Sequence, residues 1–142
     1  MYRRILVPLE HTGTDDAIIA HVRLLARTCG SAIVLIHVAD GWAARNIHQL
    51  ELRESEEMRE DRAYLERVSA ELQREGLDVD AVLAAGDPAK EIAAAAERED
   101  CDLIAMATHG HRLLEDVVRG STATGLRHLT KIPVLMVRGG KP

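Results

Sequence analysis

Aromatic residues are nearly absent from this sequence of 142 residues, which has no Phe, one Trp and two Tyr. Proteins that bind single-stranded nucleic acid stack the bases on aromatic side chains and carry clustered positive charge. This chain has a formal net charge of −5, and its basic residues are scattered apart from Arg3 and Arg4. The composition therefore argues against nucleic acid as a partner.

Cysteines and long apolar runs are also scarce. Cys29 and Cys101 lie in neither a metal-binding nor a redox spacing, so we expect two reduced thiols in a cytoplasmic protein. No segment approaches the roughly twenty apolar residues of a membrane span, and the apolar run near the start is too short for a signal peptide. With 46% hydrophobic residues, the chain is expected to form one soluble domain over residues 1–142.

Short apolar runs of β-rich composition alternate with helical stretches along the chain. The expected strands are Arg4–Leu9, Ala32–Val38, Val79–Ala84, Leu103–Ala107 and Ile132–Val137. The expected helices are Asp15–Thr28, Glu51–Glu75, Pro88–Arg98 and Ser121–Thr130. Asp40–Gln49, which contains Trp42, is expected to form a loop or a lid. This order predicts an α/β fold of three layers, in which helices cover both faces of a five-stranded, doubly wound parallel sheet of order 3-2-1-4-5.

Residues typical of caps mark the expected helix ends. Thr14 is expected to cap the first helix and Gly30 to end it. Asp87 is expected to cap the third helix, with Pro88 in its first turn. One face of the first helix is expected to hold Ala17, Ala20, His21, Leu24, Leu25 and Thr28. The second helix has an apolar stripe of Met58, Leu65, Val68 and Leu72 and is expected to stop at Gly76.

The fourth strand and the segment after it are the most informative part of the sequence. The strand ends in Thr108-His109-Gly110, and after nine further residues Gly120-Ser121-Thr122 opens the last helix. Glycine allows backbone to approach a ligand closely, and N–H groups at a helix start favour anions, so this arrangement suits a phosphate. In doubly wound sheets, ligands bind beyond the carboxyl ends of the strands where the strand order reverses. We therefore expect these segments to meet residues 8–12, which follow the first strand, at one crevice.

Five segments resemble the universal stress protein family, in the right order and across essentially the whole chain. They are Ile5–Glu10, His37-Val38, Gly86–Ile92, Asp102–Gly110 with Gly120-Ser121, and Ile132–Val137. The resemblance implies the adenine-nucleotide alpha hydrolase-like fold and, in members that bind nucleotide, ATP with or without Mg²⁺. It also implies a homodimer through the strand Ile132–Val137, whose apolar residues and Pro133 are typical of an edge strand.

The resemblance divides the nucleotide-binding residues into two groups. It implies that adenine and ribose lie against Pro8, Leu9, Glu10, Val38, Met106 and Ala107. It implies that the phosphates lie over Gly110, Gly120, Ser121 and Thr122, with His109 nearby. The guanidinium groups of Arg112 and Arg119 could add charge-assisted contacts to these phosphates.

Three positions depart from the family pattern. Ala107 stands where the family has Gly, Glu10 stands where it usually has Asp, and His11 stands where a small residue would fit better. Ala107 is harmless in extended backbone but costs roughly 1–2 kcal/mol in left-handed geometry.

Several of these residues also have ordinary structural roles. Glu10 is equally well a solvated carboxylate at a strand end, Gly110 and Gly120 are typical turn glycines, and Ser121 is a good helix N-cap. His37 is expected to face a neighbour within the sheet.

Motifs for phosphate chemistry or metal binding are incomplete. The chain has no P-loop motif, and Thr108-His-Gly-His111 matches the H-x-G-H of nucleotidyltransferases only loosely. No carboxylate or Cys at useful spacing completes a metal site with His109 and His111. Our interpretation is a regulatory module of the stress response that binds ATP with little or no turnover, rather than an enzyme. A nucleotide-free dimeric scaffold of the same fold and a weak hydrolase or nucleotidyl-transfer enzyme stay open as alternatives.

Overall fold

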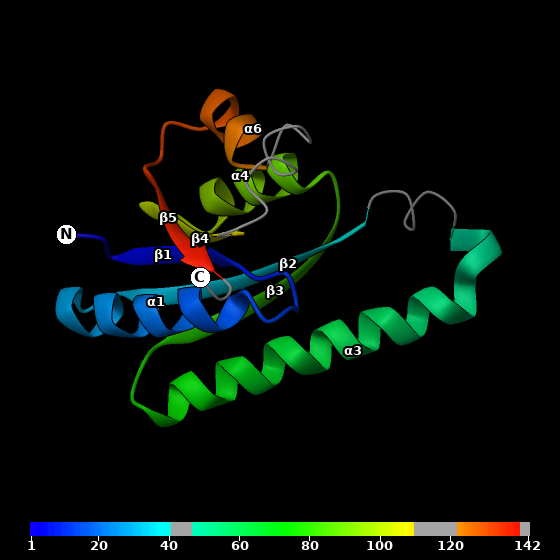
Figure 1. Cartoon of the computed structure of the whole chain (residues 1–142), viewed down its shortest axis with the longest axis horizontal. Helices are drawn as coiled ribbons and strands as arrows, with labels where there is room; N and C mark the ends of the chain where they lie inside the picture. Colours follow the sequence, from blue (N-terminus) through cyan, green and yellow to red (C-terminus); the bar gives the residue numbers. More distant parts are fainter. Residues whose placement is uncertain (41–46, 110–121, 140–142) are drawn as a thin grey trace.

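The structure, a computed structural model, describes residues 1–40, 47–109 and 122–139; of Asp40, residues 47–55 and His109 only the backbone is described. Within these ranges the sheet has five parallel strands in the order β3-β2-β1-β4-β5, which confirms the predicted topology (Figure 1). The strands are β1 (Arg4–Pro8), β2 (Ala32–Asp40), β3 (Val79–Gly86), β4 (Leu103–His109) and β5 (Val134–Gly139). The helices are α1 (Asp15–Cys29), α3 (Ile47–Arg74), α4 (Pro88–Arg98) and α6 (Thr122–Leu129).

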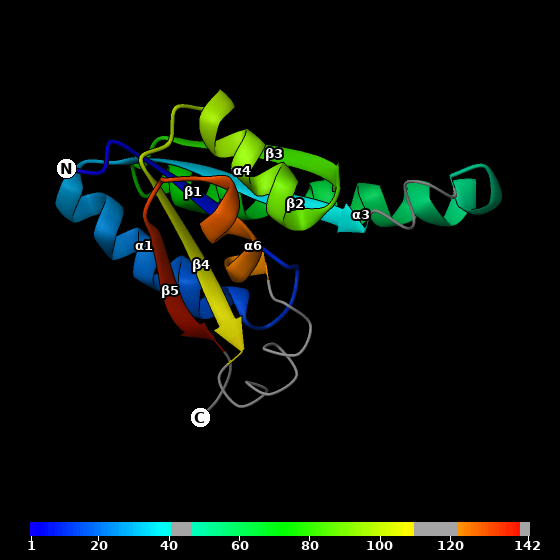
Figure 2. The same cartoon turned by 90° about the horizontal axis from the view of Figure 1, so that it is seen from above.

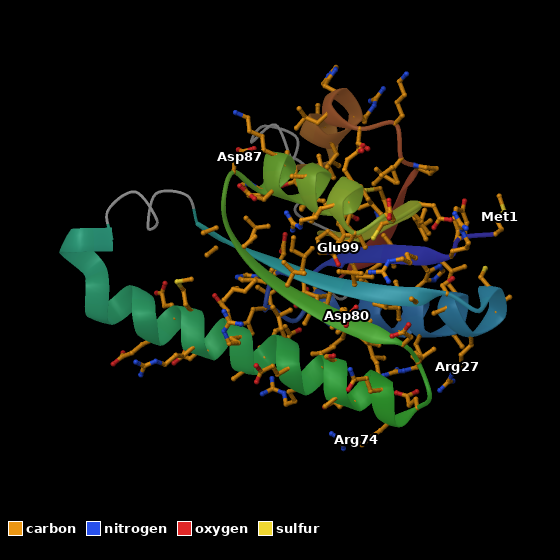
Figure 3. All side chains as sticks on the ribbon, turned by 180° about the vertical axis from the view of Figure 1, so that it is seen from behind. Met1, Arg27, Arg74, Asp80, Asp87 and Glu99 are labelled. Carbon is orange, nitrogen blue, oxygen red and sulfur yellow. The ribbon has the colours of Figure 1, made fainter. Side chains whose placement is uncertain are left out.

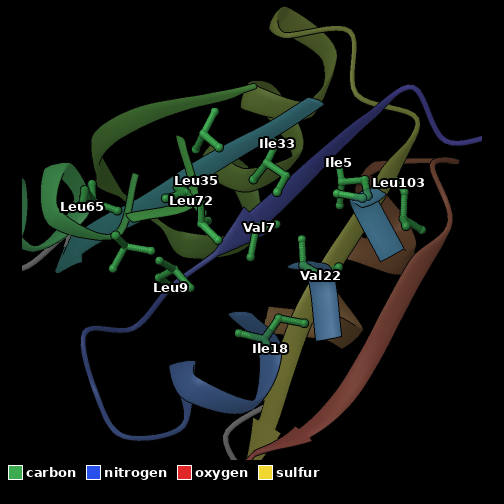
Figure 4. Packing of buried hydrophobic residues seen from close by; sticks show 14 residues of the cluster. Ile5, Val7, Leu9, Ile18, Val22, Ile33, Leu35, Leu65, Leu72 and Leu103 are labelled. Carbon is green, nitrogen blue, oxygen red and sulfur yellow. The ribbon is translucent and has the colours of Figure 1, made fainter. Parts of the chain in front are cut away.

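Helices cover both faces of the sheet. Helices α1 and α3 lie on one face, and α4 and α6 lie on the other (Figure 1). Successive side chains of a strand point to opposite faces, so both faces must be apolar when both are covered. Val7 and Leu35 accordingly pack with Ile18 of α1 and Leu65 of α3 (Figure 4), whereas Val34 packs on the α4 side.

The bounds of several segments differ from the sequence-based expectation, most of all around α3 and in the last strand. The segment expected to be irregular over Asp40–Gln49 is shorter, because β2 pairs with β3 as far as Asp40 and α3 begins at Ile47. The last strand begins at Val134 rather than Ile132 and continues to Gly139. Pro133 has no N–H to donate and precedes the strand, where its carbonyl accepts a hydrogen bond from Ile104 N. Trp42 lies outside the described residues.

The predicted cap of α1 is wrong, and the face that the sequence analysis singled out is not the buried one. Thr14 makes no side-chain cap bond because its own backbone is already helical (φ −67°, ψ −20°), whereas an N-cap is extended. The buried residues of α1 are Asp15, Ile18, Val22 and Ala26. The expected face is largely exposed instead, with Ala20, His21, Leu24 and Thr28 all open to solvent.

Other helix signals on the described residues are confirmed, although Met58 of the predicted stripe is only half-buried, and the N-cap candidate Ser121 lies outside these residues. Gly30 ends α1 in left-handed backbone (φ 68°), and Asp87 caps α4 by accepting a hydrogen bond from Lys90 N at 3.1 Å (Figure 3). On α3, Leu65, Val68 and Leu72 are buried, while the N-terminal part of the helix extends beyond the sheet (Figures 1 and 2). Among the described residues, none of the helices combines the length and the hydropathy needed to span a bilayer.

Candidate functional site

The sheet opens between β1 and β4, where the strand order reverses. These two strands pair only at Ile5–Leu103 and Leu6–Ile104. In contrast, β1 stays paired with β2 as far as Pro8–Ile36, and β4 stays paired with β5 as far as His109–Gly139. The two halves of the sheet therefore separate toward their carboxyl ends, which is where ligands bind in folds of this type.

A cavity of about 230 Å³ occupies this opening. It lies at the ends of β1, β2 and β4 and is bordered by the starts of α1, α4 and α6. Its lining residues are Pro8, Leu9, Glu10, Asp15, Ile36, His37, Val38, Pro88, Ile92, Met106, Ala107 and Thr122. The lining is mostly apolar with a few polar groups, as is typical of small-molecule sites.

The structure brings together most of the predicted site residues that it describes. Those that line the cavity are Pro8, Leu9, Glu10, Val38, Met106, Ala107 and Thr122. His109 is the last residue of β4 to pair with β5, opposite Gly139, and only its backbone is described. Gly110, Arg112, Gly120 and Ser121 lie outside the described residues.

The structure shows the backbone conformation at two of the positions that depart from the family pattern. Ala107 lies within β4 and has no positive φ, so its Cβ carries no left-handed penalty. His11 does adopt left-handed backbone, with φ 63°, a conformation that costs a residue with a side chain on the order of 1 kcal/mol and persists only where its surroundings hold it. Contacts made by this loop must therefore hold His11 in place.

Asp15 is a site residue that sequence reasoning missed. It lines the cavity, yet only 1% of its surface is exposed. Its carboxylate accepts hydrogen bonds from the backbone N–H groups of Glu10 (2.9 Å) and His11 (2.8 Å). The phenol of Tyr64 on α3 donates a third, at 2.6 Å. Asp15 thus fixes the loop between β1 and α1. An acidic residue in a first helical turn gives no local sign of such contacts, because it is also what the helix dipole favours.

Tyr64 supports Asp15 as a permanent hydrogen-bond donor. Burial raises the pKa of the Tyr64 phenol well above its usual value, and the hydrogen bond to Asp15 raises it further. The phenol therefore stays protonated at physiological pH. On its other side the Tyr64 ring stacks with the imidazole of His11, with 4.1 Å between ring centroids and an interplanar angle of 15°.

A second polar chain joins the cavity to α3. His37 lines the cavity, and its Nδ1 lies 2.8 Å from the carbonyl oxygen of Leu9. Its Nε2 lies 3.2 Å from Oδ2 of Asp61, while Nδ1 of His11 lies 2.8 Å from Oδ1 of the same carboxylate. His37 was expected to face a neighbour within the sheet, but its Nδ1 contacts the backbone of Leu9 just after β1, and its other contact, Asp61 on α3, was not foreseen.

The two ends of the cavity differ in their electrostatic character. Glu10 and Asp15 line it at the β1 side, where the Glu10 carboxylate suits hydroxyl or amino donors of a ligand. Thr122 lines it at the start of α6, where helix N–H groups favour an anion. Within the described ranges, no group of three or more His, Cys, Asp or Glu residues is arranged to hold a metal ion.

Comparison with known proteins places this geometry in context. The sequence matches the family model described as "Universal stress protein family" over residues 1–138. Universal stress protein MJ0577 of Methanocaldococcus jannaschii is 26% identical over 155 residues, covering 97% of this chain and 96% of its own. A solved structure of hypothetical protein MJ0577 covers 100% of this chain and 99% of its own with a TM-score of 0.81.

Two further solved structures share the fold and contain nucleotides. A universal stress protein in complex with cAMP is 16% identical with a TM-score of 0.71, and covers 98% of both chains. The universal stress protein of Archaeoglobus fulgidus in complex with dAMP is 17% identical with a TM-score of 0.63, and covers 96% of this chain and 98% of its own. Since the family model spans nearly the whole chain and the fold agrees with it, this chain belongs to the universal stress protein family.

Proposed function

We propose that the protein is a homodimeric regulatory module that binds ATP in the cavity between β1 and β4, with little or no turnover. The observation that carries the proposal is the coincidence of three features at one place. The sheet opens there, the opening holds a cavity, and the lining contains the residues expected to contact adenine and ribose. Family relatives in complex with cAMP and dAMP support an adenine nucleotide as the ligand.

The described residues fit the base and sugar end of an adenine nucleotide. Val38 and Met106 offer apolar surface for the purine, and Ala107 in extended strand leaves room beside it. The carboxylate of Glu10 lies at the same opening and can accept a hydrogen bond from a ribose hydroxyl. This arrangement supports the assignment of adenine and ribose to the β1 side of the cavity.

The phosphate end is proposed at the start of α6. Thr122 begins this helix and lines the cavity, so its backbone and hydroxyl can hold a phosphate oxygen there. Gly110, Gly120 and Ser121, with Arg112, would complete the phosphate site from the segment before α6. The carboxylates of Glu10 and Asp15 repel phosphates from the opposite end, which favours one orientation of the nucleotide.

Dimerisation is proposed through β5, which pairs with β4 on one side at the edge of the sheet (Figure 2). Met136 of this strand is 40% exposed, an unusual degree for a large apolar residue in a strand. A second copy of the same strand would cover it. Met136→Asp should give a monomer in sedimentation velocity, whereas Leu24→Asp, which changes an exposed apolar residue of α1, should leave a dimer. A wild-type monomer at micromolar concentration would contradict this part of the proposal.

Calorimetry with ATP tests the cavity directly. In Ala107→Leu the larger side chain would enter the space assigned to the nucleotide, so we expect ATP affinity to fall by about tenfold or more, equivalent to about 1.4 kcal/mol. Ala85→Leu is the matched control, because Ala85 is an exposed strand residue outside the cavity lining. Equal affinities of the two variants would contradict the placement of the nucleotide. Wild-type protein that binds no ATP would favour the nucleotide-free scaffold.

Substitutions at two glycines test the proposed phosphate end of the cavity. Gly120→Val should abolish ATP binding while the fold survives, because a branched side chain would occupy the phosphate position. Gly13→Val is its control, since a Cβ at Gly13 meets nothing within 4 Å and the backbone there is not left-handed. Retained affinity in Gly120→Val would contradict the assignment of this glycine.

A further inference from the structure

The backbone at the β1 end of the cavity is held first by the sheet and then by Asp15. The N–H of Leu9 still donates to the carbonyl oxygen of Ile36 on β2, at 2.8 Å. The next two N–H groups, those of Glu10 and His11, donate instead to Oδ1 and Oδ2 of Asp15, at 2.9 and 2.8 Å. The sheet therefore holds this segment as far as Leu9, and Asp15 holds it at Glu10 and His11.

The carboxylate of Asp15 faces the loop before its helix. A carboxylate at a helix start commonly accepts from the N–H groups of the first turn. The bonds of Asp15 run the other way, back along the chain by four residues to His11 and by five to Glu10. Only 1% of Asp15 is exposed, and a carboxylate is costly to bury unless its oxygens are bonded. These hydrogen bonds therefore give Asp15 and the loop a defined position relative to each other.

Tyr64 holds the same loop from α3. Its hydroxyl donates at 2.6 Å to Oδ2 of Asp15, the oxygen that also accepts from the N–H of His11. Its ring stacks with the imidazole of His11, whose left-handed backbone persists only where its surroundings hold it. Tyr64 thus contacts both the residue that carries the hydrogen bonds and the strained residue next to Glu10.

These contacts bear on Glu10, which lines the cavity and is exposed. Its carboxylate is the group proposed above to accept a hydrogen bond from a ribose hydroxyl. A long side chain loses conformational freedom when it binds a ligand, and this cost grows if its backbone must be ordered as well. Because the N–H groups of Glu10 and of the residue after it are already bonded to Asp15, the backbone part of this cost is met before a nucleotide arrives.

We propose that Asp15 is a positioning residue that gives the cavity a preference for nucleotides with ribose hydroxyls. It acts through the backbone of Glu10, whose carboxylate accepts from the sugar, and Tyr64 keeps Asp15 in place. This inference rests on the proposed function, since it names a selectivity of the same site. A nucleotide without these hydroxyls has no donor for Glu10, so the role of Asp15 is measured by comparing two nucleotides.

Asp15→Asn tests this role without changing the size of the side chain. An asparagine has one oxygen where a carboxylate has two, so it cannot accept from the N–H groups of both Glu10 and His11 in this geometry. Its NH₂ group then faces one of these N–H groups, which must turn away. Asp16→Asn is the matched control, because Asp16 is exposed in the same helical turn and its change removes the same charge.

The experiment measures the affinities of ATP and 2′,3′-dideoxy-ATP by calorimetry. The second nucleotide lacks both hydroxyls, so the comparison does not depend on which of them meets Glu10. We expect wild type and Asp16→Asn to prefer ATP by about tenfold, and Asp15→Asn to prefer it by about threefold or less. A merely structural role of Asp15 would weaken both nucleotides equally. A preference of about tenfold retained in Asp15→Asn would therefore overturn the inference.

A double-mutant cycle tests whether Asp15 acts through Glu10. Glu10→Ala removes the acceptor, so the two nucleotides should bind this variant with about equal affinity. Adding Asp15→Asn to Glu10→Ala should leave the ratio of the two affinities unchanged. A preference for ATP retained in Glu10→Ala, or a further change of the ratio in the double variant, would overturn the inference.

Tyr64→Phe is the second variant, and it decides the question if Asp15→Asn does not fold. It removes the donor to Asp15 but keeps the ring that stacks with His11. The preference for ATP should fall in this variant too, by less than in Asp15→Asn, because both backbone N–H groups keep their acceptor. An unchanged preference in Tyr64→Phe would overturn the inference.

Hydrogen exchange of the protein without nucleotide separates this inference from the proposed function. The amides of Glu10 and His11 should exchange faster in Asp15→Asn than in wild type and Asp16→Asn. Equal exchange in all three proteins would overturn the positioning role even where ATP binds. If wild type binds neither nucleotide, the proposed function fails and the ribose preference fails with it, whereas faster exchange in Asp15→Asn would still show that Asp15 fixes the loop.

Discussion

Asp15→Ala should destabilise the fold far more than a change of a surface carboxylate. The substitution removes three hydrogen bonds, from the N–H groups of Glu10 and His11 and from the hydroxyl of Tyr64. Bonds to a charged group contribute about 1.5–3 kcal/mol each. Glu10 and His11 are exposed, so their N–H groups can turn to water, whereas the half-buried phenol is left without its acceptor. We therefore expect the free energy of unfolding to fall by about 2–4 kcal/mol in urea denaturation.

Asp16→Ala is the matched control for this prediction. Asp16 stands next to Asp15 in the first turn of α1, but it is exposed, so its loss should change stability by no more than about 0.5 kcal/mol. Removing Asp15 should also lower the pKa of Tyr64 in an ultraviolet pH titration, although the pKa should stay above its usual value because burial is the larger cause. Equal stabilities of the two alanine variants, or an unchanged Tyr64 titration, would refute the role assigned to Asp15.

Further predictions concern the supporting structure. Gly125→Ala should destabilise the fold by about 1–3 kcal/mol in urea despite the better helix propensity of alanine, because its Cβ would lie 2.8 Å from that of Ala89 on α4; an increase in stability would contradict this. Burial raises the pKa of the Cys101 thiol, so this thiol should react with iodoacetamide only on unfolding, and the half-buried Cys29 should react first. Asp102 is partly buried, which acts to raise its pKa, but the backbone N–H groups of Arg3 and Arg4 outweigh this and lower it. The stability that Asp102 provides is therefore present above its unfolded-state pKa and lost as pH falls through its folded-state pKa, so Asp102→Asn should show a smaller loss of stability between neutral and acidic pH than wild type; an equal loss would contradict the assignment.

The sheet was predictable because its strands are buried on both faces. Runs such as Ala32–Ile36 are apolar at consecutive positions, whereas the sequence of α3 is rich in charged residues. The strand boundaries were less certain because they depend on pairing with neighbours. Asp40 continues β2 because it pairs with Gly86, and no property of the local sequence requires that.

The buried face of α1 was not predictable from its own periodicity. Apolar residues occur on nearly every side of this helix, so several stripes fit the period of 3.6. Burial of Asp15 and its contact with Tyr64 accompany the burial of Ile18 and Val22. That contact spans 49 residues, so a local pattern cannot reveal it.

The candidate site was likewise predictable from the sequence only in part. Pro8 and Met106 follow from the rule that ligands bind at the carboxyl ends of strands where the order reverses, and Val38 came from the resemblance to the family. Asp15, Asp61 and Tyr64 come from helices, and their roles depend on side chains that approach from a different layer. Sequence reasoning therefore found the strand ends that form the cavity, and it missed the contacts that hold them.

The most direct test of the central claim is to purify the protein without added nucleotide, denature it, and identify what is released by chromatography and mass spectrometry. Our account predicts near-stoichiometric ATP or ADP, which would also show that Glu10 and Ala107 are compatible with binding. An empty protein that also binds no added MgATP in calorimetry would contradict the account.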